Sequence, residues 1–126
     1  MSGGATRFQD YLGHILDAID RIQRYTAGID EAAFVANELV QDAVIRNLEI
    51  IGEASRNVQR RYPNLAARHS NLPFISAYEM RNALSHGYFS IDLGIIWETV
   101  QRDLPGFSDQ VRALSIETKG TDEVPE

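Results

Sequence analysis

The feature that most restricts the fold of this chain is the spacing of apolar residues near its amino terminus. Seven apolar residues follow one another at helical intervals: Phe8, Tyr11, Leu12, Ile15, Leu16, Ile19 and Ile22. Intervals of three and four place such residues on one stripe of an α-helix. The sequence therefore predicts an amphipathic helix from about residue 6 to residue 26.

The segment that follows predicts two further helices of unequal length. Gly28 is expected to end the first helix, and Asp30 offers a side-chain acceptor to the free N–H groups of the next. The helical pattern then continues to Pro63 and is long enough to predict a break near Asn37. We expect a short helix, a break and a long helix, followed by a loop over residues 65–72 that carries Arg68 and His69.

The second half of the chain also shows helical spacing of its apolar residues. Pro73 is suited to the first turn of a helix that Gly87 ends just after His86. Ser90 or Asp92 is expected to cap the next helix, whose apolar face continues to Leu104 and includes Trp97. The Pro-Gly pair at residues 105–106 predicts a break before one last short helix.

These patterns predict an all-α fold, because the sequence shows no alternating strand pattern and no internal repeat. With 126 residues the chain has the length of one domain. We expect an antiparallel helical bundle of four main helices plus short extra helices, spanning residues 7–116. Residues 1–6 are expected to be flexible, and residues 117–126 to form a disordered acidic tail.

Composition excludes several classes of function. The chain has no cysteine, which excludes disulfides, thiolate metal sites and cysteine nucleophiles. It shows neither a signal peptide nor a membrane-spanning apolar stretch, and we expect a cytoplasmic protein. The net charge of −6 argues against a general nucleic-acid binder, although the tail from Glu117 holds half of this excess.

One segment near the end of a predicted helix combines residues suited to phosphodiester cleavage. His86 can take and give a proton near neutral pH, and Arg81 can neutralise a phosphate or its transition state. RNA supplies its own nucleophile, the 2′-OH, so this pair needs neither metal nor cofactor. Asn82 is placed to hydrogen-bond either His86 or a phosphate oxygen.

Helix geometry separates the two candidate catalytic side chains. Successive helical residues rotate by about 100°, so Arg81 and His86 diverge by roughly 140°. Either the backbone opens at Gly87, or two copies of the helix pair across a two-fold axis and complete each other's site. We favour the pairing, with the opening contributing.

The same segment resembles a known family. Residues 80–89 read Met-Arg-Asn-Ala-Leu-Ser-His-Gly-Tyr-Phe. This is similar to the hallmark of HepT-like HEPN toxins, in which an Arg and a polar residue are followed by three more residues, a His and a Tyr two further on. Residues 43–54 and 92–105 resemble the flanking helices, and the resemblance covers roughly residues 8–115. Phe74 stands where the family often has Trp.

The resemblance implies a function and a set of partners. It implies a bundle of the HEPN type, a homodimer with the motif in a shared cleft, and metal-independent ribonuclease activity on an RNA substrate. It also implies a type VII-like toxin–antitoxin system in which a small nucleotidyltransferase antitoxin adds AMP to the motif tyrosine, here Tyr88. The added phosphodiester would place negative charge beside His86 and repel RNA.

Further polar residues remain open to two interpretations. Arg46 and Glu53 are expected either to support Arg81 and His86 or to form, with Glu49, a solvated salt-bridge ladder. Basic residues elsewhere are expected either to contact RNA or to be solvated at a helix end or in a loop: Arg56, Arg60, Arg61 and Arg68. We interpret His14 as structural and His69 as a solvated loop residue.

Two other functions remain as alternatives. The first is a catalytically silent helical adaptor that binds and positions a partner nucleotidyltransferase. The second is a nucleotide-binding helper in which Arg81 and His86 hold ATP phosphates, although the sequence lacks a glycine-rich phosphate loop.

Overall fold

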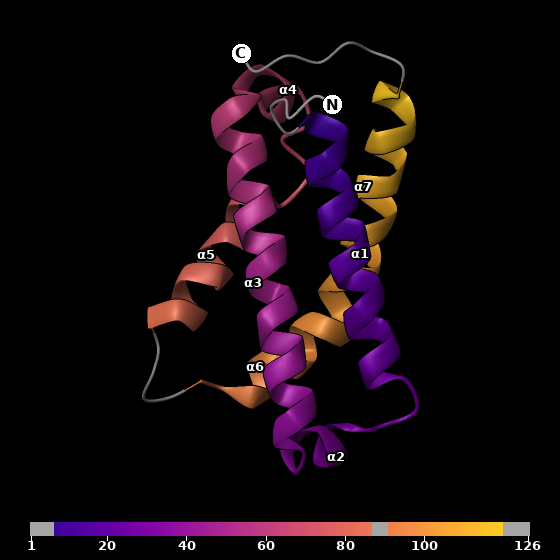
Figure 1. Cartoon of the computed structure of the whole chain (residues 1–126), viewed down its shortest axis with the longest axis vertical. Coiled ribbons are helices and arrows are strands. Elements are labelled where there is room, and N and C mark those ends of the chain that lie inside the picture. The colour runs from indigo at the N-terminus through magenta and orange to yellow at the C-terminus, as the bar shows by residue number, and fades with distance from the viewer. Residues whose placement is uncertain (1–6, 87–90, 120–126) are drawn as a thin grey trace, which may run out of the picture.

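The computed structural model describes residues 7–86 and 91–119, and in these ranges the regular structure is entirely helical (Figure 1). The elements are α1 (Phe8–Thr26), α2 (Glu31–Val35), α3 (Glu38–Arg61), α4 (Pro63–Arg68), α5 (Phe74–His86), α6 (Leu93–Glu98), a π-helical segment (Thr99–Asp103) and α7 (Leu104–Thr118). The predicted all-α fold is confirmed.

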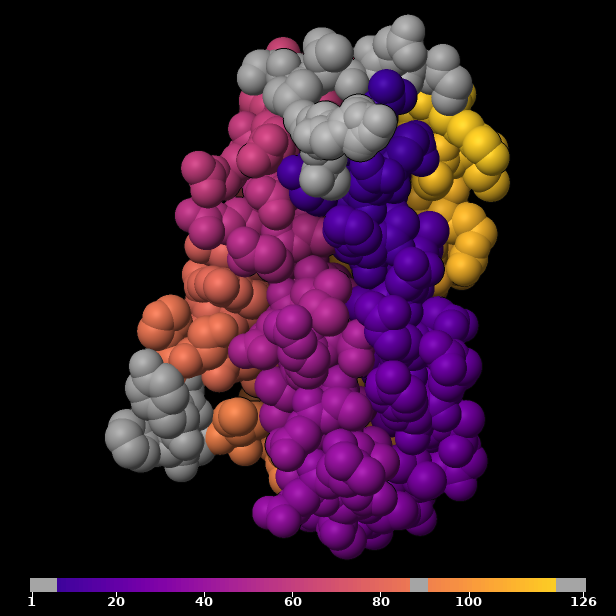
Figure 2. Space-filling view, viewed as in Figure 1, coloured from indigo at the N-terminus to yellow at the C-terminus, as the bar shows by residue number. Residues whose placement is uncertain are grey.

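The four longest helices, α1, α3, α5 and α7, form the bundle. α1 lies between α3 and α7, and successive long helices run in opposite directions (Figure 1). α5 packs chiefly against the other side of α3 and so lies at the edge of the bundle. The space-filling view shows the same order of helices across the molecule (Figure 2). No helix in the described ranges is both long enough and apolar enough to cross a membrane.

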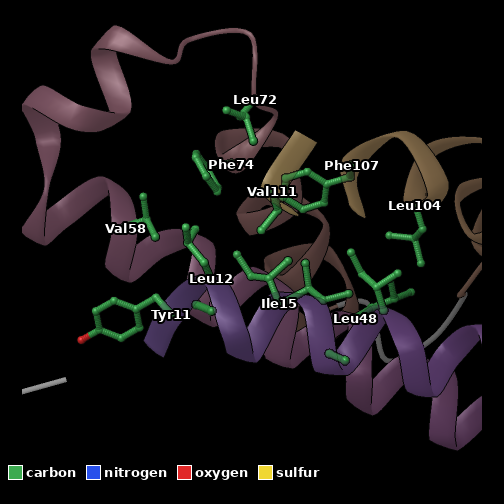
Figure 3. Packing of buried hydrophobic residues seen from close by; sticks show 14 of the residues in the cluster. Tyr11, Leu12, Ile15, Leu48, Val58, Leu72, Phe74, Leu104, Phe107 and Val111 are labelled. Atoms are coloured by element: carbon green, nitrogen blue, oxygen red, sulfur yellow. The ribbon is translucent and has the colours of Figure 1, made fainter. Parts of the chain in front are cut away.

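The core forms where the apolar stripe of α1 meets α3 and α7 (Figure 3). Six of the seven residues predicted for this stripe are buried, and Leu16 is partly buried against the same cluster. Aromatic rings close the core, with the Phe74 and Phe107 ring centroids 5.9 Å apart at an angle of 71°. Trp97 is half-buried, and its ring centroid lies 5.4 Å from that of Phe34, which is fully buried.

The helix starts occur where the sequence places capping residues. Gly28 has a φ of +76°, a conformation that favours glycine, and so ends the turn after α1. The side chain of Asp30 accepts a hydrogen bond from the amide of Ala33 at 2.9 Å, and Asn37 caps α3 in the same way. Asp92 caps α6, whereas Ser90, the other predicted cap, lies outside the described residues.

The prediction of a loop over residues 65–72 is wrong in its first part. Residues 63–68 form α4, with Pro63 in its first turn. Proline is well suited to this position, because the first N–H groups of a helix have no partner within the helix. Leu65 and Ala66 are buried, so tertiary packing favours a helix here. The weak spacing pattern of the apolar residues in this segment did not indicate it. Arg68 ends α4, and His69 follows it.

The predicted break at residues 105–106 is also wrong. Pro105 and Gly106 lie in the first turn of α7, which continues directly from the π-helical segment. The amide of Leu104 donates to the carbonyl of Thr99, five residues earlier. This wider turn makes room for the proline ring. Because proline has no N–H, the helix lacks one backbone hydrogen bond at this position. α7 continues to the buried residue Thr118, so residues 117 and 118 are helical and not part of a tail as predicted. The expected flexible residues 1–6 and the rest of the expected tail, residues 120–126, lie outside the described residues.

Candidate active site at the crossing of α3 and α5

Close contact between the backbones of α3 and α5 places the candidate catalytic helix. A β carbon at Gly52 would lie 2.8 Å from the carbonyl oxygen of Ala77 and would overlap the β carbon of Arg81. Glycine is therefore the only residue type that allows this approach without a shift. Sequence analysis gave Gly52 no role, although a glycine inside a long helix is a signal of close packing.

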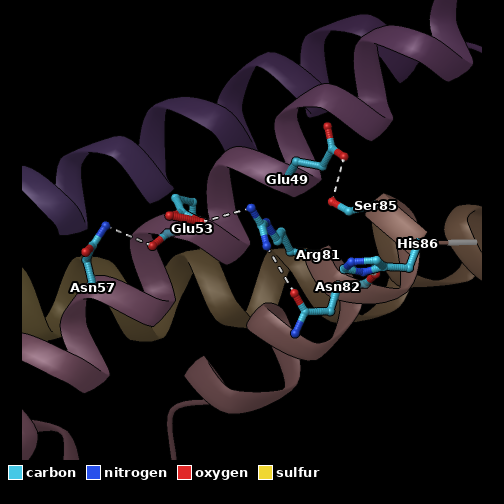
Figure 4. A network of polar contacts seen from close by, with 7 residues as sticks. All are labelled: Glu49, Glu53, Asn57, Arg81, Asn82, Ser85 and His86. Carbon is cyan, nitrogen blue, oxygen red and sulfur yellow. Dashed lines mark hydrogen bonds and ion pairs between the residues drawn. The ribbon is translucent and has the colours of Figure 1, made fainter.

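Arg81 is held by two neighbours (Figure 4). Its Nη2 lies 3.4 Å from Oε1 of Glu53 on α3, and its Nη1 donates to Oδ1 of Asn82 at 3.1 Å. The Arg81 side chain is 30% exposed. The guanidinium is thus oriented by a carboxylate and an amide and remains accessible.

His86 lies at the end of α5 and is exposed. Its Nδ1 is 2.9 Å from the backbone carbonyl oxygen of Asn82. Because a carbonyl oxygen only accepts, this hydrogen bond places the ring proton on Nδ1. Nε2 is then the nitrogen available to a substrate, and no other hydrogen bond to His86 occurs within residues 7–86 and 91–119.

Arg81 and His86 do not share a partner side chain. Arg81 contacts α3 through Glu53, whereas His86 bonds to the preceding turn of its own helix. No hydrogen bond or ion pair joins the two among the described residues. Two residues of the motif lie outside the described residues. They are Gly87, where an opening of the backbone is expected to contribute, and Tyr88, the expected acceptor of AMP.

A hollow of about 400 Å³ adjoins Arg81. We call it the α1–α3–α5 hollow, after the helices whose side chains line it, including Tyr11, His14, Arg46, Glu49, Glu53 and Ser85. Oγ of Ser85 donates to Oε2 of Glu49 at 3.2 Å and so forms a second polar link between α3 and α5 (Figure 4).

The salt-bridge ladder considered for α3 is absent from the described part of the chain. Glu53 pairs with Arg81 and Glu49 accepts from Ser85, both across to α5. Arg46 lines the same hollow and forms no ion pair with any described residue. The spacing on α3 was predicted correctly, but the two carboxylates have their partners on α5 and not on α3 itself.

The four arginines considered for RNA contact lie in two places. The Arg56 guanidinium lies over the ring of Tyr78 on α5, 5.2 Å from its centroid, so that Arg56 also packs against α5. Arg60 and Arg61 end α3, and Arg68 ends α4; all three are exposed. They lie near the junction of α3 and α4, at the other end of α5 from His86 (Figure 1).

The two other histidines have partners within the bundle. His14 is exposed, lines the α1–α3–α5 hollow and packs edge-on against Tyr11 at 6.3 Å between ring centroids. His69 is not a solvated loop residue as predicted, because Nε2 lies 3.5 Å from Oε2 of Glu117 and its side chain is only 20% exposed. Within the described ranges, no three or more His, Asp or Glu side chains gather as a metal site.

A family model and a relative that match this chain name the same family. The sequence model of the ribonuclease HepT-like family matches residues 15–114. A protein of Thermococcus cleftensis named "Probable ribonuclease HepT" is 38% identical over 106 residues, which cover 84% of this chain and 94% of that protein.

A second relative is much longer than this chain. A Methanocaldococcus jannaschii protein named "Gamma-glutamylcyclotransferase and putative RNase" is 39% identical over 101 residues, 80% of this chain. The match covers 44% of that protein, so the present chain spans less than half of its length. No solved structure matches the chain significantly. With a family match over most of its length and relatives above 30% identity, the chain belongs to the ribonuclease HepT-like family.

Proposed function

We propose that this chain is a metal-independent ribonuclease that uses Arg81 and His86 in a cleft shared by two copies. The observation that carries the proposal is the pairing of an oriented, accessible guanidinium with an exposed imidazole near the end of the same helix. Glu53 and Asn82 hold the Arg81 guanidinium, and the backbone of Asn82 leaves Nε2 of His86 free. Membership of a ribonuclease family supports RNA as the substrate.

The proposed reaction uses the 2′-OH of RNA as the nucleophile. Nε2 of His86 takes the proton of the 2′-OH as the 2′-oxygen bonds to phosphorus and the bond from phosphorus to the 5′-oxygen breaks. The leaving 5′-oxygen receives a proton from a water molecule, the hydroxide so formed takes back the proton held by His86, and the products are a 2′,3′-cyclic phosphate and a 5′-hydroxyl. Arg81 neutralises the negative charge that develops on the phosphoryl oxygens.

The position of α5 supports a site shared between two copies. α5 packs chiefly against α3, and residues on its outer side such as Ile75, Glu79 and Ala83 are exposed. Ile75, an apolar residue, is 60% exposed. A two-fold axis beside α5 would bury this face and bring Arg81 of one copy toward His86 of the other.

We further propose that the chain is the toxin of a toxin–antitoxin system. A small nucleotidyltransferase antitoxin would neutralise it by transferring AMP to the hydroxyl of Tyr88, two residues after His86. The bond formed joins the tyrosine oxygen to the α-phosphorus of ATP, and pyrophosphate leaves. The resulting phosphodiester carries negative charge, which would repel an RNA phosphate from the site.

Substitution of the imidazole tests the ribonuclease proposal. His86→Ala should abolish RNA cleavage and growth inhibition, while circular dichroism and gel filtration show the fold and dimer of the wild type. His69→Gln removes a histidine distant from the motif and serves as the matched control. Undiminished cleavage by the His86→Ala variant would contradict the proposal. Wild-type protein that binds a nucleotidyltransferase but neither cleaves RNA nor inhibits growth would favour the silent adaptor.

Mass spectrometry tests the proposed modification. Co-expression with a nucleotidyltransferase encoded beside this chain should add the mass of AMP to the peptide that contains Tyr88. The Tyr88→Phe variant should remain unmodified and toxic under the same conditions. An unmodified Tyr88 in a neutralised complex would exclude AMP transfer as the means of inhibition.

A further inference from the structure

The α1–α3–α5 hollow combines some apolar surface with polar groups that phosphodiester cleavage does not require. Ile50, Ala54 and Tyr11 supply apolar surface, whereas Arg46 and Glu49 supply charge. Its volume of about 400 Å³ lies within the range of about 300–1,000 Å³ that is typical of small-molecule sites. Apolar surface beside several hydrogen-bonding side chains suits a flat heterocycle with its own donors and acceptors better than a hydrated ion.

Arg46 contributes an unpaired cation to the hollow. It is exposed and forms no hydrogen bond or ion pair with any residue in the described ranges. Its acidic neighbours Glu49 and Glu53 have partners on α5 instead. The five N–H donors of its guanidinium are therefore available to a ligand.

Glu49 contributes an oriented acceptor. Its Oε2 accepts from Oγ of Ser85, which fixes the carboxylate relative to α5, and Oε1 has no partner among the described residues. A carboxylate has about four lone-pair sites, so Glu49 can still accept two hydrogen bonds. The carboxylates of Glu49 and Glu53 balance the two arginines that line the hollow, so the lining carries no net charge and suits a neutral base.

We propose that this hollow binds a guanine base of the RNA, next to the phosphate held by Arg81. Guanine presents two adjacent donors, N1–H and N2–H, which match the Glu49 carboxylate, and two acceptors, O6 and N7, which match an arginine fork. Adenine and cytosine lack the paired donors, and uracil has a single N–H on its pairing edge. The inference rests on the proposed ribonuclease function, because Arg81 lines the hollow and places it beside the cleaved bond.

Binding of short RNAs to the uncleaving His86→Ala protein tests the inference. Fluorescence anisotropy would compare pentanucleotides of uridine whose central base is guanine, hypoxanthine, adenine or uracil. We expect the guanine oligonucleotide to bind about tenfold more tightly than the adenine one, within the range of a good bidentate base contact. Hypoxanthine, which lacks the 2-amino group, should fall between them.

Second substitutions in the same protein assign the preference to residues. Glu49→Gln keeps the size of the side chain and replaces one acceptor with donors, so the preference for guanine over adenine should fall to near one. Arg46→Gln should reduce the same ratio and leave the fold intact, because the Arg46 side chain is exposed and pairs with no residue in the described ranges. Arg24→Gln, on α1 outside the hollow, removes the same charge and should leave the ratio unchanged.

The outcomes separate this inference from the proposed function. Equal affinity for the guanine and adenine oligonucleotides, or a preference that survives Glu49→Gln, overturns the guanine site. A wild-type chain that cleaves RNA without any guanine preference overturns the guanine site alone. Guanine-selective binding by a wild-type chain that cleaves no RNA overturns the ribonuclease proposal and leaves the guanine site standing.

Discussion

Gly52 on α3 and Arg81 on α5 lie so close that a β carbon at Gly52 would overlap the β carbon of Arg81. The same added carbon would come within 2.8 Å of the carbonyl oxygen of Ala77. This contact sets the distance between the two helices, and with it the ion pair between Arg81 and Glu53. A glycine remote from the motif in sequence thus positions the motif arginine.

We predict that Gly52→Ala separates α3 from α5. The inserted methyl group meets backbone and a β carbon, neither of which can rotate away, so the free energy of unfolding should fall by about 1–3 kcal/mol. Urea denaturation measures this loss, and RNA cleavage should fall with it because Arg81 moves away from Glu53.

Gly13→Ala is the matched control for Gly52. Gly13 lies inside α1, and an added β carbon there meets no atom within 4 Å. Alanine is the better helix former, so this variant should gain up to about 1 kcal/mol. An equal gain for Gly52→Ala would contradict the close crossing.

We predict that Glu53→Gln separates the effects on catalysis and on binding. The amide cannot hold the Arg81 guanidinium by charge, so kcat should fall, by about tenfold if the orientation of Arg81 in the transition state is lost. KM should not rise, because the variant removes a negative charge that repels RNA. Steady-state cleavage of a labelled RNA measures both constants.

Two further variants test whether the charge of Glu53 accounts for the change in kcat. Glu53→Asp keeps the charge and should recover part of kcat, which a merely structural role for Glu53 would not predict. Glu98→Gln removes a carboxylate that pairs with Arg102 and lies outside the hollow, and it should leave both constants unchanged. A kcat for Glu53→Gln equal to that of the wild type would show that the ion pair does not orient Arg81 for cleavage.

Cleavage through the 2′-OH makes a prediction about the substrate. Replacement of the ribose at the cleaved position by 2′-deoxyribose should abolish cleavage, because the nucleophile is then missing. Excess EDTA should leave the rate on unmodified RNA unchanged, and the product should carry a cyclic phosphate detectable by mass spectrometry. Loss of activity in EDTA that added Mg²⁺ restores would contradict the metal-independent mechanism.

Local signals in the sequence predicted much of this fold. The stripe on α1 is a repeat within one helix, and Asp30, Asn37 and Asp92 cap helices through amides two or three residues away. Such interactions depend on neighbours in sequence. The errors at Pro63 and Pro105 have a different origin, because proline is compatible with both the end of one helix and the first turn of the next. Burial of Leu65 and Ala66 decides the first case, and it depends on the tertiary structure.

The sequence named the residues of the candidate site, and the structure adds their contacts. The motif and its helical rotation indicated that Arg81 and His86 diverge. In the structure Arg81 pairs with Glu53 and the side chain of Asn82, whereas His86 bonds to the backbone carbonyl of Asn82. Sequence spacing aligned Glu53 with Arg46 on α3 but could not show that Glu53 pairs with Arg81, 28 positions later. That pair, like the bond from Ser85 to Glu49, depends on the helix crossing at Gly52.

A mixture of two inactive variants tests whether the active site is shared. If Arg81 of one copy acts with His86 of the other, a heterodimer of Arg81→Ala and His86→Ala chains contains one intact site and one doubly altered site. Co-refolding equal amounts should then restore about a quarter of the wild-type activity, since half of the dimers are mixed and each has one working site. If both residues act from the same chain, every site in every dimer carries one defect and the mixture stays inactive. Each variant refolded alone is the control, and an inactive mixture whose heterodimers are verified by affinity tags would refute the shared site.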